Sequence, residues 1–485
     1  MPETSSRRDL SGRKWELAFY GVVLAYFAAR VVWMALRLHP YVPPDEVTHI
    51  GRVLAYATVW GVPDNSPATL EYGLIDHRPW LYYWVMARAL ALNVFGMPDL
   101  VFARLVNGAL GLGTVVLAIV WVREWCESPW ARILLAVLLT NTLMFTGLAA
   151  SVSYDNGANF LAALSLLAFT RFRTTRRVEW LLALASALLA GCLAKRTFLP
   201  LAVLMGAWLL VRHRESLPLL LHNAKSALAT ARPATWALLG GTLLLAGFNV
   251  ALYGGNLVEY GALRPRFDHV VGEANAMQNR IFARGRILEQ YRAGEITLGE
   301  AQAATRQIRH MGDRSDTLFL LKTAQLPESS VIGRLPYVGE WSWRMLKSSV
   351  GYLGHRRAVK TDLEAYGYLA IVAMAALAIG WTWRPGAAAG VPVDAAFLVG
   401  AYAFVLMWLV NYPAYQSSRY IELALQGRYL FPVLLPIWGL VAYGLGEATP
   451  PRVRPFIVVA VAAFFVYGDL PWFVQQIGPR WLVPS

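Results

Sequence analysis

Long apolar runs dominate the hydrophobic pattern of this chain. A run of roughly 17 to 25 apolar residues is long enough to cross the hydrocarbon core of a bilayer as one helix. We count about eleven such runs, enough to make membrane spans the main architectural element. They lie at residues 15–38, 102–122, 131–150, 156–172, 179–194, 197–212, 235–253, 363–383, 395–413, 429–446 and 456–473. The pattern therefore predicts an all-α polytopic membrane protein with about eleven transmembrane helices.

Two long polar segments separate these runs, at residues 39–101 and 254–361. Within the first, Trp80 to Gly96 is apolar, but Pro79 precedes it and Arg88 interrupts it, so we expect a helix lying in the membrane interface. The second segment is mixed in charge and is predicted to be largely helical. In it, Thr297 followed three residues later by Glu300 indicates a capping box at a helix start.

These features divide the chain into three predicted regions. An amino-terminal module of seven spans covers residues 1–253 and contains the first outer loop, 39–101. A long outer helical loop follows at 254–361, and a carboxyl-terminal region of four spans completes the chain at 362–485.

Composition and charge exclude other classes of protein. Of the 485 residues, 57% are hydrophobic and only 15% are charged, whereas soluble domains carry about 25% charged residues, so a soluble enzyme is excluded. The net charge is +14. Because the basic residues lie between apolar runs, as in Arg171 to Arg177, we assign them to cytoplasmic loops and expect the bilayer, not nucleic acid, as partner. This sidedness places the amino terminus in the cytoplasm and the carboxyl terminus outside.

Candidate chemistry begins just after the first span, in the run Pro43-Pro44-Asp45-Glu46-Val-Thr-His49. Pro44 fits the first turn of a helix, which would place Asp45 and His49 on one face. Two interpretations stay open. The acids could simply stabilise the helix dipole, or the two carboxylates and the imidazole could supply a general base or hold a divalent cation. No cofactor is certain from the sequence.

Further ionisable residues fall on the same predicted face of the membrane. Asp155 stands in the short outer turn between the third and fourth runs, where it could cap the next helix or serve the chemistry. Lys195 and Arg196 interrupt an apolar stretch, and Arg428 opens the tenth run. Such cations could contact lipid headgroups by snorkelling. Beside carboxylates they would also suit a phosphate-bearing lipid, since the arginine fork binds two phosphate oxygens.

The Pro-Pro-Asp-Glu-x-x-His49 run, the Gln426-Gly-Arg-Tyr429 run and the Ser349-Val-Gly-Tyr-Leu-Gly354 stretch resemble a bacterial family of multi-span proteins. That family is similar to the GT-C superfamily of glycosyltransferases, which take sugars from polyprenyl-phosphate carriers on the outer side of the membrane. The resemblance implies a GT-C-like fold in the bacterial cytoplasmic (inner) membrane. Many relatives carry a large soluble carboxyl-terminal domain, which the pattern of this sequence does not predict, so we expect the long outer loops to recognise the acceptor.

The resemblance also implies roles for individual residues. The expected reaction transfers a sugar from a polyprenyl-phosphate-linked donor to an acceptor hydroxyl on an envelope glycan or lipid. The predicted catalytic residues are Asp45, Glu46 and Asp155, and the predicted substrate-binding residues are His49, Lys195, Arg196, Arg428 and Tyr429.

The aromatic residues Trp80, Tyr82 and Tyr83 belong first to the interface belt and could also line a sugar or lipid groove. A rival interpretation is a transporter or flippase for lipid-linked saccharides, which would also combine many spans with intramembrane charge. Against it, the acids gather near the outer face and not at the midplane, and the spans show no inverted repeat.

Overall fold

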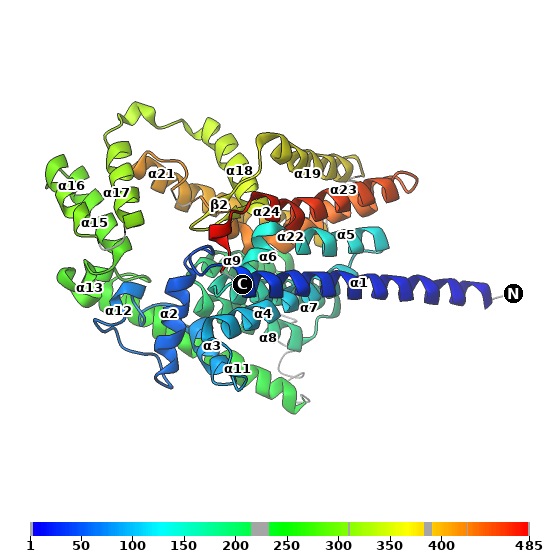
Figure 1. The fold of residues 1–485 in the computed structure, drawn as a ribbon. Coiled ribbons are helices and arrows are strands. Elements are labelled where there is room, and N and C mark those ends of the chain that lie inside the picture. The colour runs from blue at the N-terminus through cyan, green and yellow to red at the C-terminus, as the bar shows by residue number, and fades with distance from the viewer. Residues whose placement is uncertain (1–2, 215–231, 309–310, 383–389, 424, 484–485) are drawn as a thin grey trace.

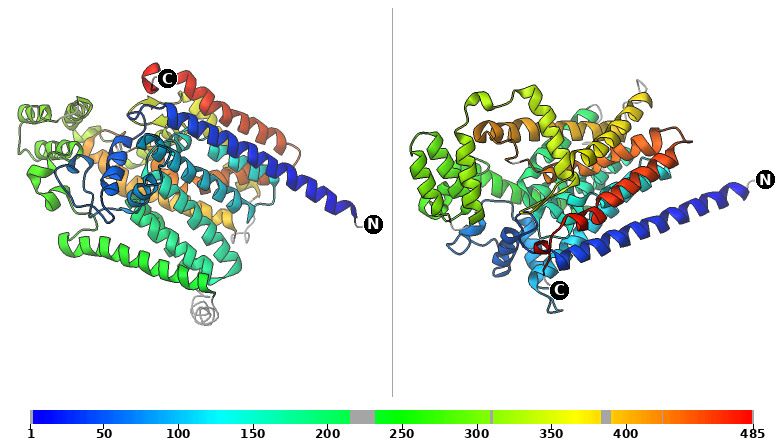
Figure 2. Two further views of the ribbon diagram at one scale, coloured as in Figure 1. Left: turned by 60° about the horizontal axis from the view of Figure 1, so that its bottom comes forward. Right: turned by 45° about the horizontal axis from the view of Figure 1, so that its top comes forward.

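A computed structural model describes residues 3–214, 232–308, 311–382, 390–423 and 425–483. The described chain is almost entirely helical, and its long helices pack side by side into one bundle (Figure 1). Shorter helices from the two long loops gather at the end of the bundle away from the amino terminus, and two further views give the same arrangement (Figure 2).

The helices of the amino-terminal part include the two shorter helices of the first loop, α2 and α3. Their bounds are α1 Glu3–Arg37, α2 Glu46–Ala57, α3 Leu81–Leu90, α4 Asp99–Arg123, α5 Pro129–Thr140, α6 Leu143–Ala149, α7 Tyr154–Thr175, α8 Val178–Ala194, α9 Leu199–His213 and α11 Pro233–Asn249. Short 3₁₀ turns at Leu70–Tyr72 and Arg196–Phe198 and a π-helical turn at Val250–Gly254 connect or extend them.

The second loop contributes α12 Gly255–Tyr260, α13 Phe267–Val271, α14 Glu273–Ala276, α15 Arg280–Arg292, α16 Leu298–Arg306, α17 Met311–Ala324 and α18 Arg334–Val350, with a 3₁₀ turn at Glu328–Ser330. Strands β1 Tyr352–Leu353 and β2 Arg357–Ala358 pair antiparallel in a small hairpin. The remaining helices are α19 Asp362–Thr382, α20 Val391–Val405, α21 Tyr412–Ser418, α22 Leu434–Tyr443, α23 Arg454–Gly468 and α24 Leu470–Gln476. Turns of π type at Leu406–Asn411 and Gly444–Ala448 and of 3₁₀ type at Gly427–Val433 and Pro479–Trp481 complete this part.

The chain is a helical membrane protein with several spans. Among the described residues, seven helical stretches are long and apolar enough to cross a membrane, and the bent pair α5 and α6 raises the number to eight. The seven stretches are Lys14–Arg37, Asp99–Arg123, Pro233–Tyr260, Asp362–Thr382, Val391–Ser418, Gly427–Ala448 and Arg454–Gln476.

The predicted count of eleven spans is not confirmed. The other three predicted runs do form helices, α7, α8 and α9, but α8 has 17 residues and α9 has 15, which is short for a span. Helix α7 buries polar residues such as Asn156, Asn159 and Ser165 within the bundle. Packing against neighbouring helices therefore positions these three helices as much as the apolar character of their residues does.

The run predicted as one span at 131–150 is broken. Helices α5 and α6 meet at an angle of 62° around Asn141 and Thr142. The carbonyl of Thr140 accepts a hydrogen bond of 2.8 Å from Arg30, and Asn141 accepts another of 3.1 Å. Because these polar groups are satisfied from α1, the chain can leave the helical hydrogen-bond pattern here without leaving buried groups unpaired.

Two local predictions for the loops are confirmed. Helix α3 occupies only Leu81–Leu90, and ten residues span about 15 Å, half of what a crossing requires. Thr297 and Glu300 form the reciprocal capping box that opens α16. The first loop also lies beside the last residues of the chain, since Leu38 forms a β-bridge with Leu482.

Candidate active site

Asp45 lies immediately before α2, with its backbone in the left-handed region at φ 58° and ψ 12°. Few non-glycine residues adopt this conformation, and Asp is one of those that tolerate it. The prediction that Pro44 occupies the first turn is wrong, because the helix begins at Glu46, after the left-handed residue. The His49 N–H still donates to the Asp45 carbonyl over 3.0 Å.

The Asp45 carboxylate meets a single arginine that also reaches a second acid. Arg428 Nη2 donates to Asp45 Oδ2 over 2.7 Å, and Nη1 donates to Asp155 Oδ2 over 3.4 Å. The Arg428 side chain is only 3% exposed and Asp155 2%, whereas Asp45 is 38% exposed. Of the two carboxylates, Asp45 is therefore the one that a molecule arriving from outside can touch.

Asp155 is held from several directions. Lys195 Nζ donates to Asp155 Oδ1, and the Ser153 hydroxyl donates to Oδ2 over 2.9 Å. Ser153, not Asp155, is the N-cap of α7, since its hydroxyl accepts from the Asp155 N–H. Helix capping therefore does not explain why a carboxylate stands at this position.

We call Asp45, Asp155, Lys195 and Arg428 the ion-pair cluster. The structure brings these four predicted residues together from four separate segments: the start of α2, the start of α7, the end of α8 and the turn at Gly427–Val433. Two carboxylates face two cations, so the charges balance. Burying such charges is costly unless each is paired, and here every member is.

Glu46, the neighbour of Asp45, has a different environment. It is fully buried and receives two hydrogen bonds from Arg104, over 2.9 and 2.5 Å, and one of 2.8 Å from the Val152 N–H. Arg104 also donates to the carbonyls of Ala35 and Leu38. Glu46 thus ties α2 to α4 and to the turn before Asp155, and Arg104 ties α4 to the end of α1.

His49 is also enclosed. Its Nδ1 lies 2.8 Å from the Tyr83 hydroxyl, and its ring meets the Tyr154 ring edge-on at 4.5 Å. Burial lowers the pKa of His49 to about 3, so the imidazole is neutral at physiological pH. Its Nε2 has no hydrogen-bond partner among the described residues and no contact with solvent.

The remaining predicted residues flank the ion-pair cluster. The Tyr429 ring lies 5.8 Å from Lys195 Nζ and 5.6 Å from the Arg428 guanidinium carbon, so both cations face its aromatic surface. Arg196 directly follows Lys195 and is exposed. In the described part of the chain, Arg196 has no carboxylate at ion-pair distance.

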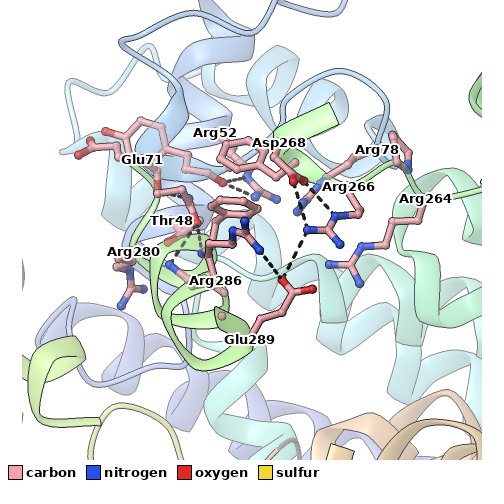
Figure 3. A pocket seen from close by; sticks show the side chains of 18 residues that line it. Thr48, Arg52, Glu71, Arg78, Arg264, Arg266, Asp268, Arg280, Arg286 and Glu289 are labelled. Carbon is pink, nitrogen blue, oxygen red and sulfur yellow. Dashed lines mark hydrogen bonds and ion pairs between the residues drawn. The ribbon is translucent and has the colours of Figure 1, made fainter. Parts of the chain in front are cut away.

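A cavity of about 700 Å³ opens beside α2 (Figure 3). Thr48 and Arg52 line it from α2, where their spacing of four residues puts them on one face of the helix. Six arginines but only three acids line this space; they are Arg52, Arg78, Arg264, Arg266, Arg280 and Arg286 against Glu71, Asp268 and Glu289. We call it the arginine cavity.

In the described part of the chain, three of these arginines lack a counter-charge: Arg52, Arg78 and Arg264. Arg52 donates instead to the Tyr72 carbonyl and the Tyr83 hydroxyl. Arg266, Arg280 and Arg286 pair with carboxylates. By contrast, Arg78 and Arg264, on the same side of the cavity in Figure 3, have no ion pair or hydrogen bond within the described ranges. Removal from water, together with the neighbouring arginines, lowers the pKa of Arg78 to about 9.

This group of arginines is not among the site residues predicted from the sequence. The signal that could have found it is the one that singled out Lys195 and Arg196, a cation in a segment predicted to lie outside. In the long loops, however, the many charged residues gave no way to tell an unpaired arginine from a paired one.

A second cavity, of about 780 Å³, is mainly apolar and adjoins the first at Arg78, which lines both. Tryptophans from the first loop line one side and residues of α11 the other, including Trp60, Trp80, Trp84, Leu244 and Phe248. Of the aromatic residues that could have lined a groove, Trp80 does so. Tyr82 and Tyr83 are instead buried, and their hydroxyls bond to Asn107 and to Arg52 and His49. We call this space the apolar cavity.

The metal interpretation gains no geometric support. Among the described residues, no group of three or more His, Cys, Asp or Glu side chains is placed to hold a metal ion. The carboxylates of Asp45 and Asp155 direct their oxygens at Arg428 and Lys195.

Comparisons with known proteins give weak likenesses. No protein-family model matches the sequence, and no curated protein matches it either, so the bacterial family suggested by the sequence motifs is not confirmed. Among solved structures, the chain is similar to ArnT from Cupriavidus metallidurans in the apo state, with 14% identity over 90% of this chain and 78% of that chain and a TM-score of 0.39. ArnT bound to undecaprenyl phosphate gives 15% identity over the same shares and a TM-score of 0.38.

The chain is also similar to the oligosaccharyltransferase AglB from Archaeoglobus fulgidus, in complex with an inhibitory peptide and a dolichol-phosphate. The identity is 11%, the TM-score is 0.43, and the match covers 98% of this chain but only 57% of that one. Identities and TM-scores this low do not assign a function, which has to be argued from the side chains of this chain.

Proposed function

We propose that this protein is a membrane glycosyltransferase, which transfers a sugar from a polyprenyl-phosphate-linked donor to an acceptor hydroxyl at the outer membrane face. The observation that carries the proposal is the meeting of three features along α2. An exposed carboxylate stands at its start, a cavity with unpaired arginines lies along its side, and an apolar cavity joins that one at Arg78.

An amphipathic anion is the ligand that suits this arrangement. The apolar cavity would take the lipid tail, because its lining of tryptophan, leucine and phenylalanine side chains gains stability by excluding water. At its end, Arg78 and Arg264 would bind the phosphate, since arginine can donate two hydrogen bonds to a phosphate in a fixed geometry. We therefore assign phosphate binding to these two residues and to Arg196, in place of Lys195 and Arg428.

Lys195 and Arg428 have another role in this proposal. Their charges are already balanced by Asp155 and Asp45, so neither is free to neutralise a phosphate. Instead they fix the position of the carboxylates. Asp155 holds Arg428 and Lys195, and Arg428 holds the exposed Asp45 toward the sugar.

The proposed reaction balances without any other reactant. The oxygen of the acceptor hydroxyl attacks the anomeric carbon, the bond from that carbon to the phosphate oxygen breaks, and the electron pair leaves with polyprenyl phosphate. The hydroxyl proton passes to the Asp45 carboxylate. Positioned proton transfer of this kind contributes about 10²- to 10⁴-fold to a rate.

The ionisation of Asp45 suits this role. Burial alone would raise the pKa of Asp45, but the adjacent Arg428 guanidinium outweighs that effect and holds the pKa well below its usual range. The carboxylate is therefore ionised throughout the neutral range and can accept a proton. Because a weakly basic carboxylate takes a proton only as the hydroxyl becomes acidic, its transfer would accompany attack on the sugar.

A binding experiment tests the ligand assignment. Purified protein in detergent is titrated with polyprenyl phosphate, with the polyprenol of equal length, and with a short alkyl phosphate, and binding is followed by quenching of tryptophan fluorescence. We expect saturable binding of polyprenyl phosphate and much weaker binding of the two partial ligands. Equal binding of the polyprenol would show that phosphate recognition at Arg78 is wrong.

A further inference from the structure

One segment singled out by its sequence has no role in the mechanism above. The stretch Ser349 to Gly354 ends α18 and enters the β1–β2 hairpin, in which Tyr352 pairs with Ala358 and Leu353 with Arg357. The turn of the hairpin is closed by a hydrogen bond of 3.1 Å from the Gly354 N–H to the Arg356 carbonyl.

The hairpin turn rests on the chain that leads into Asp45. A Cβ atom added to Gly354 would collide with the Val42 carbonyl oxygen and approach Pro44, so only glycine fits here. The His355 N–H donates to the same Val42 carbonyl over 3.2 Å. The backbone of the turn is thus fixed against the residues just before Asp45.

The other end of the same stretch contacts the turn that carries Arg428. A Cβ atom on Gly427 would collide with the backbone and the hydroxyl of Ser349. One short segment therefore lies against the residues next to both partners of the Asp45–Arg428 ion pair, although these partners are 383 residues apart in the sequence.

His355 makes the contact that is specific to Asp45. The Asp45 N–H donates to His355 Nε2 over 3.3 Å. This bond is possible only when Nε2 carries a lone pair, because a doubly protonated imidazole has two donors and no acceptor. Asp45 is in the sparsely populated left-handed region, where an extra backbone hydrogen bond helps to fix the conformation.

We propose that His355 is a positioning residue for Asp45: its neutral imidazole accepts the Asp45 N–H, holds the left-handed backbone and so aims the carboxylate at Arg428 and the reacting sugar. The effect of His355 on the reaction rests on the proposed function, whereas its effect on the backbone of Asp45 does not. Protonation of His355 would remove the acceptor and loosen Asp45.

The surroundings of His355 determine when it is protonated. The charged groups that face it are Asp45 and Arg428, which pair with each other, and Arg280 and Asp313, which also pair. Partial removal from water lowers the pKa of His355, and the two carboxylates oppose this without reversing it. The imidazole is accordingly neutral at pH 7.

The linkage between protonation and stability has a definite sign. In the unfolded chain a histidine titrates near pH 6.5, above the lowered pKa in the folded protein. Below about pH 6.5 the unfolded state therefore binds more protons, and the folded state loses stability as the pH falls. This contribution is fully present at neutral and higher pH.

The test uses two substitutions at His355. His355→Ala removes the acceptor and should lower kcat by about 10-fold or more with little change in donor KM, the pattern expected when only the reacting group is misplaced. His355→Gln offers an amide oxygen that accepts at every pH. We expect it to restore most of the rate at pH 7.5 and to abolish the histidine-dependent fall in rate below about pH 6.5. His269→Ala, at an exposed histidine on α13, is the matched control.

A second measurement stays informative if the protein transfers no sugar. Thermal unfolding is measured for His355→Ala, Asp45→Gly and the double variant. Because glycine adopts the left-handed conformation without strain, His355→Ala should lower the Tm less in the Asp45→Gly background than in the wild type. Independent effects of the two substitutions, or a wild-type pH profile for His355→Ala, would overturn the inference. Absence of transfer in the wild type together with the coupled Tm would overturn only the proposed function.

Discussion

The ion-pair cluster and the arginine cavity lie along the same helix, yet their charges are organised in opposite ways. In the ion-pair cluster, Asp45 and Asp155 balance Arg428 and Lys195 within the protein itself. In the arginine cavity, Arg78 and Arg264 have no counter-charge among the described residues. The first region is complete without a ligand, and the second is not. The cations available to a ligand's phosphate are therefore those without a carboxylate partner among the described residues, not those that lie beside the acids.

Removing the central cation of the ion-pair cluster should have the largest effect on the folded protein. Arg428→Ala leaves Asp155 buried with only Lys195 as partner, and breaking a buried ion pair typically costs about 3–5 kcal/mol. We expect a large fall in Tm, measured by tryptophan fluorescence in detergent, together with loss of turnover. Arg306→Gln, at an exposed arginine on α16, serves as control. An unchanged Tm would mean that the cluster does not depend on its internal pairing.

Glu46, the neighbour of Asp45 in the sequence, should contribute to stability and not to turnover. Glu46→Gln keeps an acceptor for the Val152 N–H but leaves the buried Arg104 without its counter-charge. Hydrogen bonds to charged groups contribute about 1.5–3 kcal/mol each, so we expect a moderate loss of stability. In the fraction that folds, kcat should stay near the wild-type value, because Glu46 does not face the proposed site.

A stable Glu46→Gln variant with no turnover would contradict this expectation. It would support the prediction from the sequence that Glu46 is a catalytic residue. Glu295→Gln, at an exposed acid of the second loop, provides the matched comparison for both Tm and kcat.

The unpaired arginines should show the smallest effect on stability and a selective effect on binding. Arg78→Gln removes a charge that no carboxylate of the described ranges balances, so the Tm should be unchanged or slightly higher. Loss of a charged hydrogen bond to phosphate, about 1.5 kcal/mol, corresponds to roughly a 10-fold rise in donor KM. Steady-state kinetics at varied donor concentration would measure it. A fall in kcat with unchanged KM would argue against phosphate binding at this residue.

Much of the fold could be predicted because each membrane span is formed by a continuous run of apolar residues. The described part of every predicted run is mainly helical, and both the short helix α3 and the capping box at Thr297 were predictable from local sequence. The bend between α5 and α6 was not, because it depends on Arg30 donating to Thr140 from a distant helix. The number of spans likewise depends on which polar helices the neighbours bury.

The sequence could predict which residues belong to the candidate site, but not which of them form ion pairs with one another. Asp45, Asp155, Lys195 and Arg428 stand out in the sequence as charges at one predicted face. Which of them neutralise each other depends on contacts between residues hundreds of positions apart, as for Arg428 and Asp45. For the same reason Arg78 and Arg264 could not be predicted, because they are distinguished only by having no ion-pair partner among the residues that the structure describes.

The most direct test of the central claim is the release of polyprenyl phosphate by purified protein in detergent, without any membrane gradient. A panel of radiolabelled polyprenyl-phosphate sugars is incubated with a heat-treated envelope extract as acceptor, and the wild type is compared with Asp45→Asn and with Asp64→Asn, an exposed acid of the same loop. The account predicts sugar transfer and lipid release by the wild type and by Asp64→Asn, and a rate lower by about 10²-fold or more for Asp45→Asn. A well-folded Asp45→Asn variant that transfers sugar at the wild-type rate would contradict it.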